Sequence, residues 1–226
     1  MGILSQEQVA PLADYDANSK YSHAYQTLYT NIRLSWDSQR LKPQTILLAT
    51  PTAYSGQAAV AACIATAAAQ TGTPAVLVDA DLHTPSLHQR FGLSNDIGLS
   101  DLLAMTSITS QAVASRLQPT VVSGLRLLCA GSTPSSGTHW LLSSRLQDVV
   151  TYMCQTVAEI EGKSGIIIFH SAPVLDSIDA VVIATLVAQT FLTIVSGRTT
   201  RSQAKQAQEQ LQCVHAQLAG AILVDV

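Results

Sequence analysis

The chain has 226 residues, of which 47% are hydrophobic and 12% are charged, and its formal net charge is −3 at pH 7. This length suits one large α/β domain, and scattered basic residues exclude nucleic acid as the main partner, because phosphate neutralisation needs clustered Lys and Arg. Apolar runs such as Val181–Ala188 are far shorter than the roughly 18–20 residues of a membrane span, and a secretion signal is missing. We therefore expect a cytoplasmic protein.

The predicted elements begin with a helix over residues 18–36, whose tyrosine-bearing stripe indicates a packing face. Short runs that are apolar throughout then alternate with helical stretches. Such runs are typical of strands covered on both faces, so the sequence predicts an α/β fold with a mostly parallel sheet flanked by helices on both faces. The predicted strands are 45–50, 75–79, 125–129, 165–169, 191–195 and 220–224, and the predicted helices are 57–71, 139–161, 177–189 and 199–216, with two short helices between residues 92 and 124.

The first strand runs into a helix through "ATPTAYSGQAAV", residues 49–60, which has the outline of a phosphate-binding loop. Such a loop combines backbone N–H groups at a helix start with a lysine for the phosphates and a Ser or Thr hydroxyl for Mg²⁺. Where G-K-[ST] would stand, this chain has Gly56, Gln57 and Ala58. Gln57 is neutral and Ala58 has no oxygen, so only the backbone part of the site is predicted to remain.

Asp79 and Asp81 end the second strand, where they would face a bound triphosphate and repel it without a lysine and a held metal. A charge-assisted hydrogen bond is worth about 1.5–3 kcal/mol, so losing the lysine alone could weaken binding by roughly one to two decades. The same two residues form a D-x-D pattern, which by itself is a weak sign of a nucleotide-sugar transferase.

The cysteines are far apart and show no C-x-x-C spacing, so the sequence predicts no zinc site and no disulfide framework. We expect buried thiols at Cys63, Cys129, Cys154 and Cys213.

Several stretches together resemble the cytoplasmic domain of bacterial tyrosine kinases, the BY-kinases of capsule and exopolysaccharide synthesis. They are "SHAYQTLYTNIRLS", "ILLATPTAYSGQAAVAACIATAAAQTG", "AVLVDADLHTPSLHQRFGLSNDIGLSDLLA", "STPSSGTHWLLSS", "SAPVLDSIDAVVIA" and "VSGRTTRSQ". The resemblance implies a deviant P-loop NTPase, a three-layer sandwich. It begins near residue 18, so we expect an N-terminal extension over 1–17 and a BY-kinase-like domain over 18–226.

The resemblance also implies where ATP and Mg²⁺ would bind. In the first family motif, Gly56 matches, whereas Gln57 replaces the lysine and Ala58 replaces the Ser or Thr. Tyr54 stands where the family has a small residue, and we predict that it fills the vacated phosphate pocket.

The second motif matches at Asp79 and Asp81, which makes them vestigial catalytic candidates. The third motif has His170 in place of its aspartate, the Walker B acid.

Further departures concern assembly and the tail. The contact helix of the family carries E-x-x-R-x-x-R, and the corresponding positions here are His23, Gln26 and Tyr29. The tyrosine-rich tail is missing after Val226, and Val224 replaces an asparagine near the base. Together these changes indicate a pseudokinase without a cofactor.

The implied partner is a membrane-anchored polysaccharide chain-length protein, a co-polymerase, or an active BY-kinase paralogue. The chain would then lie at the cytoplasmic side of the inner membrane through that partner, as part of a homo- or hetero-oligomer.

Three alternatives stay open. The first is an active ATP-dependent tyrosine kinase with divergent motifs, in which Asp79 would be a metal ligand and Asp81 the base toward a tyrosine hydroxyl. ATP and Mg²⁺ are expected only in that case. The second is a related P-loop partitioning or positioning ATPase, and the third is the nucleotide-sugar transferase.

Overall fold

The computed structural model describes residues 20–36, 43–132, 141, 144–161 and 165–225. The expected extension over residues 1–17 lies outside this part of the chain, as do most of the stretch 132–144 and the start of the helix predicted from residue 139.

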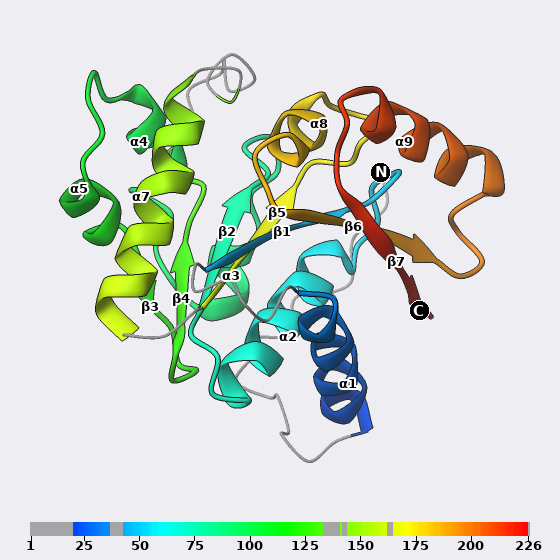
Figure 1. Cartoon of the computed structure of the whole chain (residues 1–226), viewed down its shortest axis with the longest axis horizontal. Coiled ribbons are helices and arrows are strands. Elements are labelled where there is room, and N and C mark those ends of the chain that lie inside the picture. Colours follow the sequence, from blue (N-terminus) through cyan, green and yellow to red (C-terminus); the bar gives the residue numbers. More distant parts are fainter. Residues whose placement is uncertain (1–19, 37–42, 133–140, 142–143, 162–164, 226) are drawn as a thin grey trace, which may run out of the picture.

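The described residues form a seven-stranded sheet with the order β3-β4-β2-β5-β1-β6-β7 (Figure 1). β3 pairs antiparallel with β4, and the other neighbours are parallel. The prediction of a mostly parallel sheet is thus confirmed. The strands are β1 (Gln44–Ala49), β2 (Ala75–Ala80), β3 (Gln118–Pro119), β4 (Leu125–Leu128), β5 (Ile166–Ser171), β6 (Gln189–Val195) and β7 (Leu218–Val224).

Helices cover both faces of the sheet (Figure 1). One face carries α1 (Lys20–Leu34), α2 (Gln57–Gln70) and α3 (Leu87–Phe91), and the other carries α4 (Leu99–Ala104), α5 (Ser110–Ala114), α7 (Ser144–Glu161), α8 (Asp179–Ala184) and α9 (Arg201–Cys213). Each face has its own cluster of buried apolar side chains. This arrangement is the expected three-layer sandwich.

The strands at the centre of the sheet consist mostly of apolar residues. Every residue of β1, β2 and β5 is buried, as their apolar runs predict for strands covered on both sides. The alanines of α2 let this helix lie close to the sheet, and ten of its residues are buried. Gly72 ends the helix with φ +81°, a left-handed conformation that favours glycine.

The tyrosine-bearing helix packs as predicted. Tyr29 is 1% exposed and Ile32 is equally buried, in the cluster that α1 shares with α2. Of the three positions aligned with the family's contact motif, His23 is exposed, Gln26 is partly buried and Tyr29 belongs to the core. Tyr29 is therefore a packing residue.

Three elements differ from the sequence prediction, and the first is α3, which none of the predicted helices includes. The helix predicted over 177–189 is the shorter α8, because the chain turns after Ala184 and Gln189 already begins β6. β3 was not predicted, since its two residues, Gln118 and Pro119, offer no apolar run. It exists through its pairing with β4.

Candidate functional site

A cleft of about 530 Å³ opens at the carboxyl ends of β1, β2 and β5. Its walls are Ala53 from the loop after β1, Asp81, His83 and Thr84 from the loop after β2, and part of the segment 172–178 after β5. Open α/β sheets place their ligands at this end. The sequence-predicted site residues converge around this region, although only Asp81 among them lines the cleft itself.

The loop after β1 is held closely to the segment after β5. The backbone N–H of Val174 donates to the carbonyl of Thr50 over 2.8 Å. The side-chain amide of Gln57, the first residue of α2, donates through Nε2 to the carbonyl of Ser171 over 2.6 Å. Gln57 therefore points across the loop to β5, and its backbone N–H donates to the carbonyl of Tyr54. Ala58, the next residue, is 6% exposed.

Asp79 is fully buried at the end of β2. Its Oδ2 accepts hydrogen bonds from the backbone N–H groups of Ser86 and Leu87, at 3.1 and 3.0 Å, and so anchors the start of α3. Its Oδ1 has no hydrogen-bond partner among the described residues. Burial raises the pKa of Asp79 to about 7, the negative charge of Asp81 adds to this effect, and the two N–H groups oppose it.

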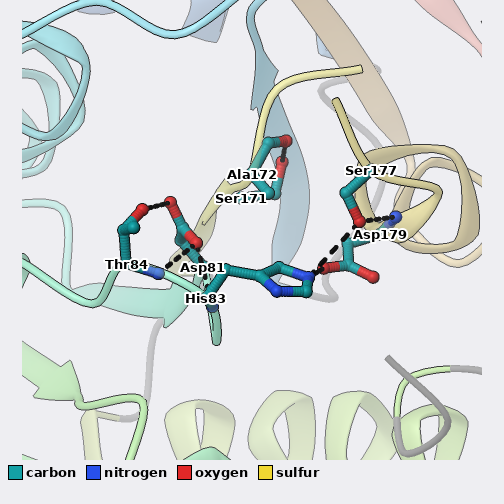
Figure 2. Close-up of polar contacts among 7 residues, drawn as sticks. All are labelled: Asp81, His83, Thr84, Ser171, Ala172, Ser177 and Asp179. Carbon is teal, nitrogen blue, oxygen red and sulfur yellow. Dashed lines mark hydrogen bonds and ion pairs between the residues drawn. The ribbon is translucent and has the colours of Figure 1, made fainter. Parts of the chain in front are cut away.

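Asp81 binds its own loop with both oxygens. Oδ1 accepts from the backbone N–H groups of His83 and Thr84, and Oδ2 accepts from the Thr84 hydroxyl over 2.8 Å (Figure 2). This is a local turn of the kind that Asp side chains stabilise. The carboxylate still lines the cleft, so its charge faces whatever enters.

His170 lies on β5 directly beside Asp79 on β2, because the two Cα atoms are register partners. Its side chain is enclosed, and Nδ1 has no hydrogen-bond partner among the described residues. Burial lowers the pKa of His170 to about 4, against the opposing charge of Asp81. The imidazole is therefore neutral at pH 7. The structure thus brings together Asp79, Asp81 and His170, as their positions at strand ends predict.

One pair that sequence reasoning missed joins two walls of the cleft. The His83 Nε2 atom lies 2.9 Å from Oδ2 of Asp179, the first residue of α8, in an ion-pair contact (Figure 2). The His83 side chain is 45% exposed, whereas that of Asp179 is 1% exposed. Burial raises the pKa of Asp179, while the neighbouring Ser177 hydroxyl and His83 oppose this.

Ser177, His83 and Asp179 are the residue types of a nucleophilic triad, but their geometry does not form one. The Ser177 hydroxyl lies 3.5 Å from His83 Nε2, the same nitrogen that contacts Asp179. A triad histidine uses its two ring nitrogens for the two partners. The contact therefore ties the β2 loop to α8, and no sequence spacing could have pointed to it.

Tyr54 turns inward. Its ring packs against the apolar cluster on the α2 face, and its hydroxyl is enclosed without a hydrogen-bond partner among the described residues. Burial raises the pKa of Tyr54 to about 12. That the ring fills a vacated phosphate pocket stays a prediction.

The described residues contain no group of three or more His, Cys, Asp or Glu side chains placed to hold a metal ion. In the same part of the chain, no helix has both the length and the apolar character needed to cross a membrane. The four cysteines are free thiols, but the prediction that all are buried is wrong: Cys129 is buried, Cys63 and Cys154 are partly buried, and Cys213 is exposed.

The chain is similar to known proteins in both sequence and fold. No family model matches the chain. It is 30% identical over 212 residues to the tyrosine-protein kinase YwqD of Bacillus subtilis, covering 94% of this chain and 84% of that protein.

Two solved structures are similar in fold. The kinase domain of the Escherichia coli tyrosine kinase ETK matches with a TM-score of 0.83 and 21% identity, over 100% of this chain and 83% of that one. The chimerical protein CapA2B2 matches with a TM-score of 0.80 and 23% identity, over 99% and 91%.

Proposed function

The chain belongs to the family of bacterial tyrosine kinases, and on this premise we propose that it is a catalytically degenerate member, a pseudokinase. It would act as a regulatory or scaffolding partner in bacterial polysaccharide synthesis and export. Residues 18–226 would form its BY-kinase-like domain, preceded by an extension over 1–17.

The observation that carries the proposal is the hydrogen bond from Gln57 to Ser171. At the position where a phosphate loop has its lysine, this chain has a neutral amide, and that amide binds the main chain at the end of β5 over 2.6 Å. A triphosphate would find no cation at this position, and the Gln57 amide is already bound to the main chain. The loss of one charge-assisted hydrogen bond corresponds to roughly one to two decades in affinity.

The residues at the positions that would bind Mg²⁺ also support the pseudokinase proposal. Mg²⁺ needs oxygen ligands in near-octahedral geometry and usually takes one or two carboxylates. Here Asp79 binds the start of α3, Asp81 binds its own turn, and the third-motif position holds the buried, neutral His170. Ala58 adds no hydroxyl. We infer that these residues fit Mg-ATP poorly, so the proposed function needs no phosphoryl transfer.

A scaffolding role requires a partner, and we propose a membrane-anchored polysaccharide chain-length protein or an active BY-kinase paralogue. The support for this partner is that the chain belongs to the family of bacterial tyrosine kinases, of which the paralogue would be an active member. The chain would then lie at the cytoplasmic side of the inner membrane through its partner, in a homo- or hetero-oligomer.

Calorimetric titration with ADP and ATP, with and without Mg²⁺, tests the loss of nucleotide binding. We expect no heat of binding from the natural chain and measurable Mg-ATP binding by the double variant Gln57→Lys with Ala58→Ser. Gln70→Lys, at the exposed far end of α2, is the matched control and should behave like the natural chain. Micromolar Mg-ATP binding by the natural chain would overturn the pseudokinase proposal.

A triple variant that adds His170→Asp restores all three motif positions. This change places a carboxylate beside the buried Asp79, so it is expected to lower stability as well. The double variant therefore remains the primary test, and circular dichroism should accompany the triple variant to separate unfolding from loss of binding.

Co-purification of the tagged chain with its membrane fraction tests the partner. Recovery of a chain-length protein or an active kinase paralogue would support the scaffolding role. A washed preparation in which neither is enriched over an untagged control would count against it.

One observation favours an active, divergent kinase as the second candidate. Asp81 lines the cleft beside Thr84, where a carboxylate could act as a base toward a tyrosine hydroxyl. Transfer of radiolabelled phosphate from ATP to a tyrosine substrate, abolished in an Asp81→Asn variant, would establish it. If no phosphate is transferred in this assay, the result supports the pseudokinase proposal.

A further inference from the structure

A second cavity lies at the opposite end of the sheet from the cleft, where β1, β6 and β7 begin. It measures about 340 Å³, at the lower end of the roughly 300–1,000 Å³ of small-molecule sites. Its wall contains the three glutamines Gln44, Gln189 and Gln217, together with Ser35 and Trp36 from the end of α1. Small apolar residues complete it, and we call this cavity the amide pocket.

The chemistry of the amide pocket is polar but uncharged. None of its described wall residues carries a charge, so this part of the wall offers no cation for a phosphate or carboxylate and no anion for an amine. Each glutamine amide offers two donors and an acceptor at one point in space. A hydroxyl group also donates and accepts at one oxygen, so an amide and a hydroxyl can satisfy each other in both directions.

Trp36 gives the pocket an aromatic wall. Its ring meets the buried Tyr29 edge to face, with centroids 6.2 Å apart and planes at 75°, which holds the indole in place. The indole N–H has no hydrogen-bond partner among the described residues. Buried indole N–H groups usually find an acceptor. This N–H therefore leaves one donor of the indole without an acceptor among the described residues.

The main chain around the pocket is shaped by a β-bulge. Thr190 of β6 pairs with Leu218, but the next residue, Phe191, pairs with Gly220, so Ala219 is the extra residue on β7. Bulges are over-represented at sheet edges and beside functional sites, where they redirect side chains. Here the bulge places Ala219 in the wall of the pocket, on the edge strand of the sheet (Figure 1).

The wall is firm because its backbone groups are already paired. The N–H of Ala188 donates to Thr45, and the N–H of Thr190 donates to the carbonyl of Gln217 over 2.7 Å. By contrast, the Gln189 side chain is held by two long hydrogen bonds of 3.3 Å, one from the Ser35 hydroxyl to Oε1 and one from Nε2 to the Ser35 carbonyl, and a ligand hydroxyl could replace either of them. Recognition would therefore come from side-chain amides on a fixed frame.

We propose that the amide pocket binds a neutral polyhydroxylated ligand, a saccharide unit. Its hydroxyls would pair with Gln189 and Gln217, and a C–H face of the sugar ring would lie on the indole of Trp36. This site is separate from the cleft at the other end of the sheet. The proposal does not rest on the catalytic status of the protein.

Ligand-detected NMR by saturation transfer, followed by titration for affinity, tests the proposal. The probes are D-glucose, D-galactose and N-acetyl-D-glucosamine, with D-glucose 6-phosphate to test for a preference for charge. We expect at least one neutral sugar to bind, and its phosphate ester to bind no more tightly. Each of the variants Gln189→Ala and Gln217→Ala should weaken that affinity about three- to tenfold, the value of one neutral hydrogen bond.

Gln206→Ala is the matched control, because Gln206 is an exposed glutamine on α9 away from the pocket, and its affinity should equal that of the natural chain. Gln217 is itself exposed, so its alanine variant is expected to fold, which circular dichroism will verify. Absence of binding for all three neutral sugars would overturn the proposal. So would sugar binding that both pocket variants leave unchanged, or a clear preference for the phosphate ester.

Discussion

The buried carboxyl group of Asp79 gives the sharpest prediction for stability. Replacing it in an Asp79→Asn variant keeps an oxygen that can accept from the N–H groups of Ser86 and Leu87, so the anchor of α3 is preserved. The change removes the titrating proton and the cost of a buried negative charge. The stability of the variant relative to the natural chain should therefore depend on pH.

The sign follows from the raised pKa of Asp79, which is about 7 in the folded protein against an ordinary value of 3.8. Between these values the folded state binds more protons than the unfolded state. The stability that protonated Asp79 contributes is fully present below about pH 4 and is lost as the pH rises through about 7. At about 1.4 kcal/mol per pH unit, the loss amounts to about 4 kcal/mol.

We therefore expect the free energy of unfolding of Asp79→Asn, relative to the natural chain, to rise by about 4 kcal/mol from pH 4 to pH 8. His170 acts in the opposite direction. Its pKa is lowered to about 4, so its contribution is present above the ordinary histidine pKa and is lost as the pH falls through about 4. Because His170 is present in both proteins, the difference between them reports the replacement of Asp79, including any change that it causes at the neighbouring His170.

Urea unfolding followed by circular dichroism across this pH range is the assay. The matched control is Asp176→Asn, the same substitution at an exposed carboxyl group beside the cleft, which should show a small and nearly constant difference. A relative stability of Asp79→Asn that stays flat between pH 4 and pH 8 would refute the reasoning. It would mean that the unfolded and folded states hold this proton equally well.

Two further substitutions test the packing of the fold. Gly98→Ala would place a Cβ atom in a steric clash with the carbonyl oxygen of Cys129, so we expect a loss of about 3 kcal/mol in thermal unfolding. Gly72→Ala, which meets no atom within 4 Å but has φ +81°, should cost only about 1–2 kcal/mol, and the reverse order would contradict the steric account. Thr200→Ala removes the cap of α9, where the hydroxyl accepts from the N–H of Gln203, and should cost about 1 kcal/mol in urea unfolding. Ser202→Ala, exposed in the first turn, is its control, and an equal loss in both would exclude a capping effect.

Much of the fold follows from local sequence patterns. β2 was predicted over 75–79 and spans Ala75–Ala80, because a strand covered on both faces is apolar at every position. The end of α2 was equally readable, since Gly72 supplies the left-handed turn that closes it. In both cases the physical cause lies within a few neighbouring residues.

Elements that depend on distant partners were not readable in the same way. α3 has only five residues, and its first N–H groups are held by Asp79, which lies on the preceding strand. β3 is a strand because its two residues pair antiparallel with β4. α3 and β3 are too short to show a periodic pattern of apolar residues, so neither was predicted from the sequence.

For the candidate site, too, some features could be predicted from the sequence and others depended on tertiary contacts. The sequence by itself determined which residues stand at the ends of the strands, Asp79, Asp81 and His170, and that the loop offers Gln57 where a lysine would be expected. Only the tertiary structure decided that the amide of Gln57 binds Ser171, which is 114 residues away.

The contact of His83 with Asp179 and the walls of the amide pocket were likewise decided by tertiary structure. The reason is physical: strand and helix propensities act between near neighbours, whereas these contacts join segments that meet only after the sheet has assembled its strands out of chain order.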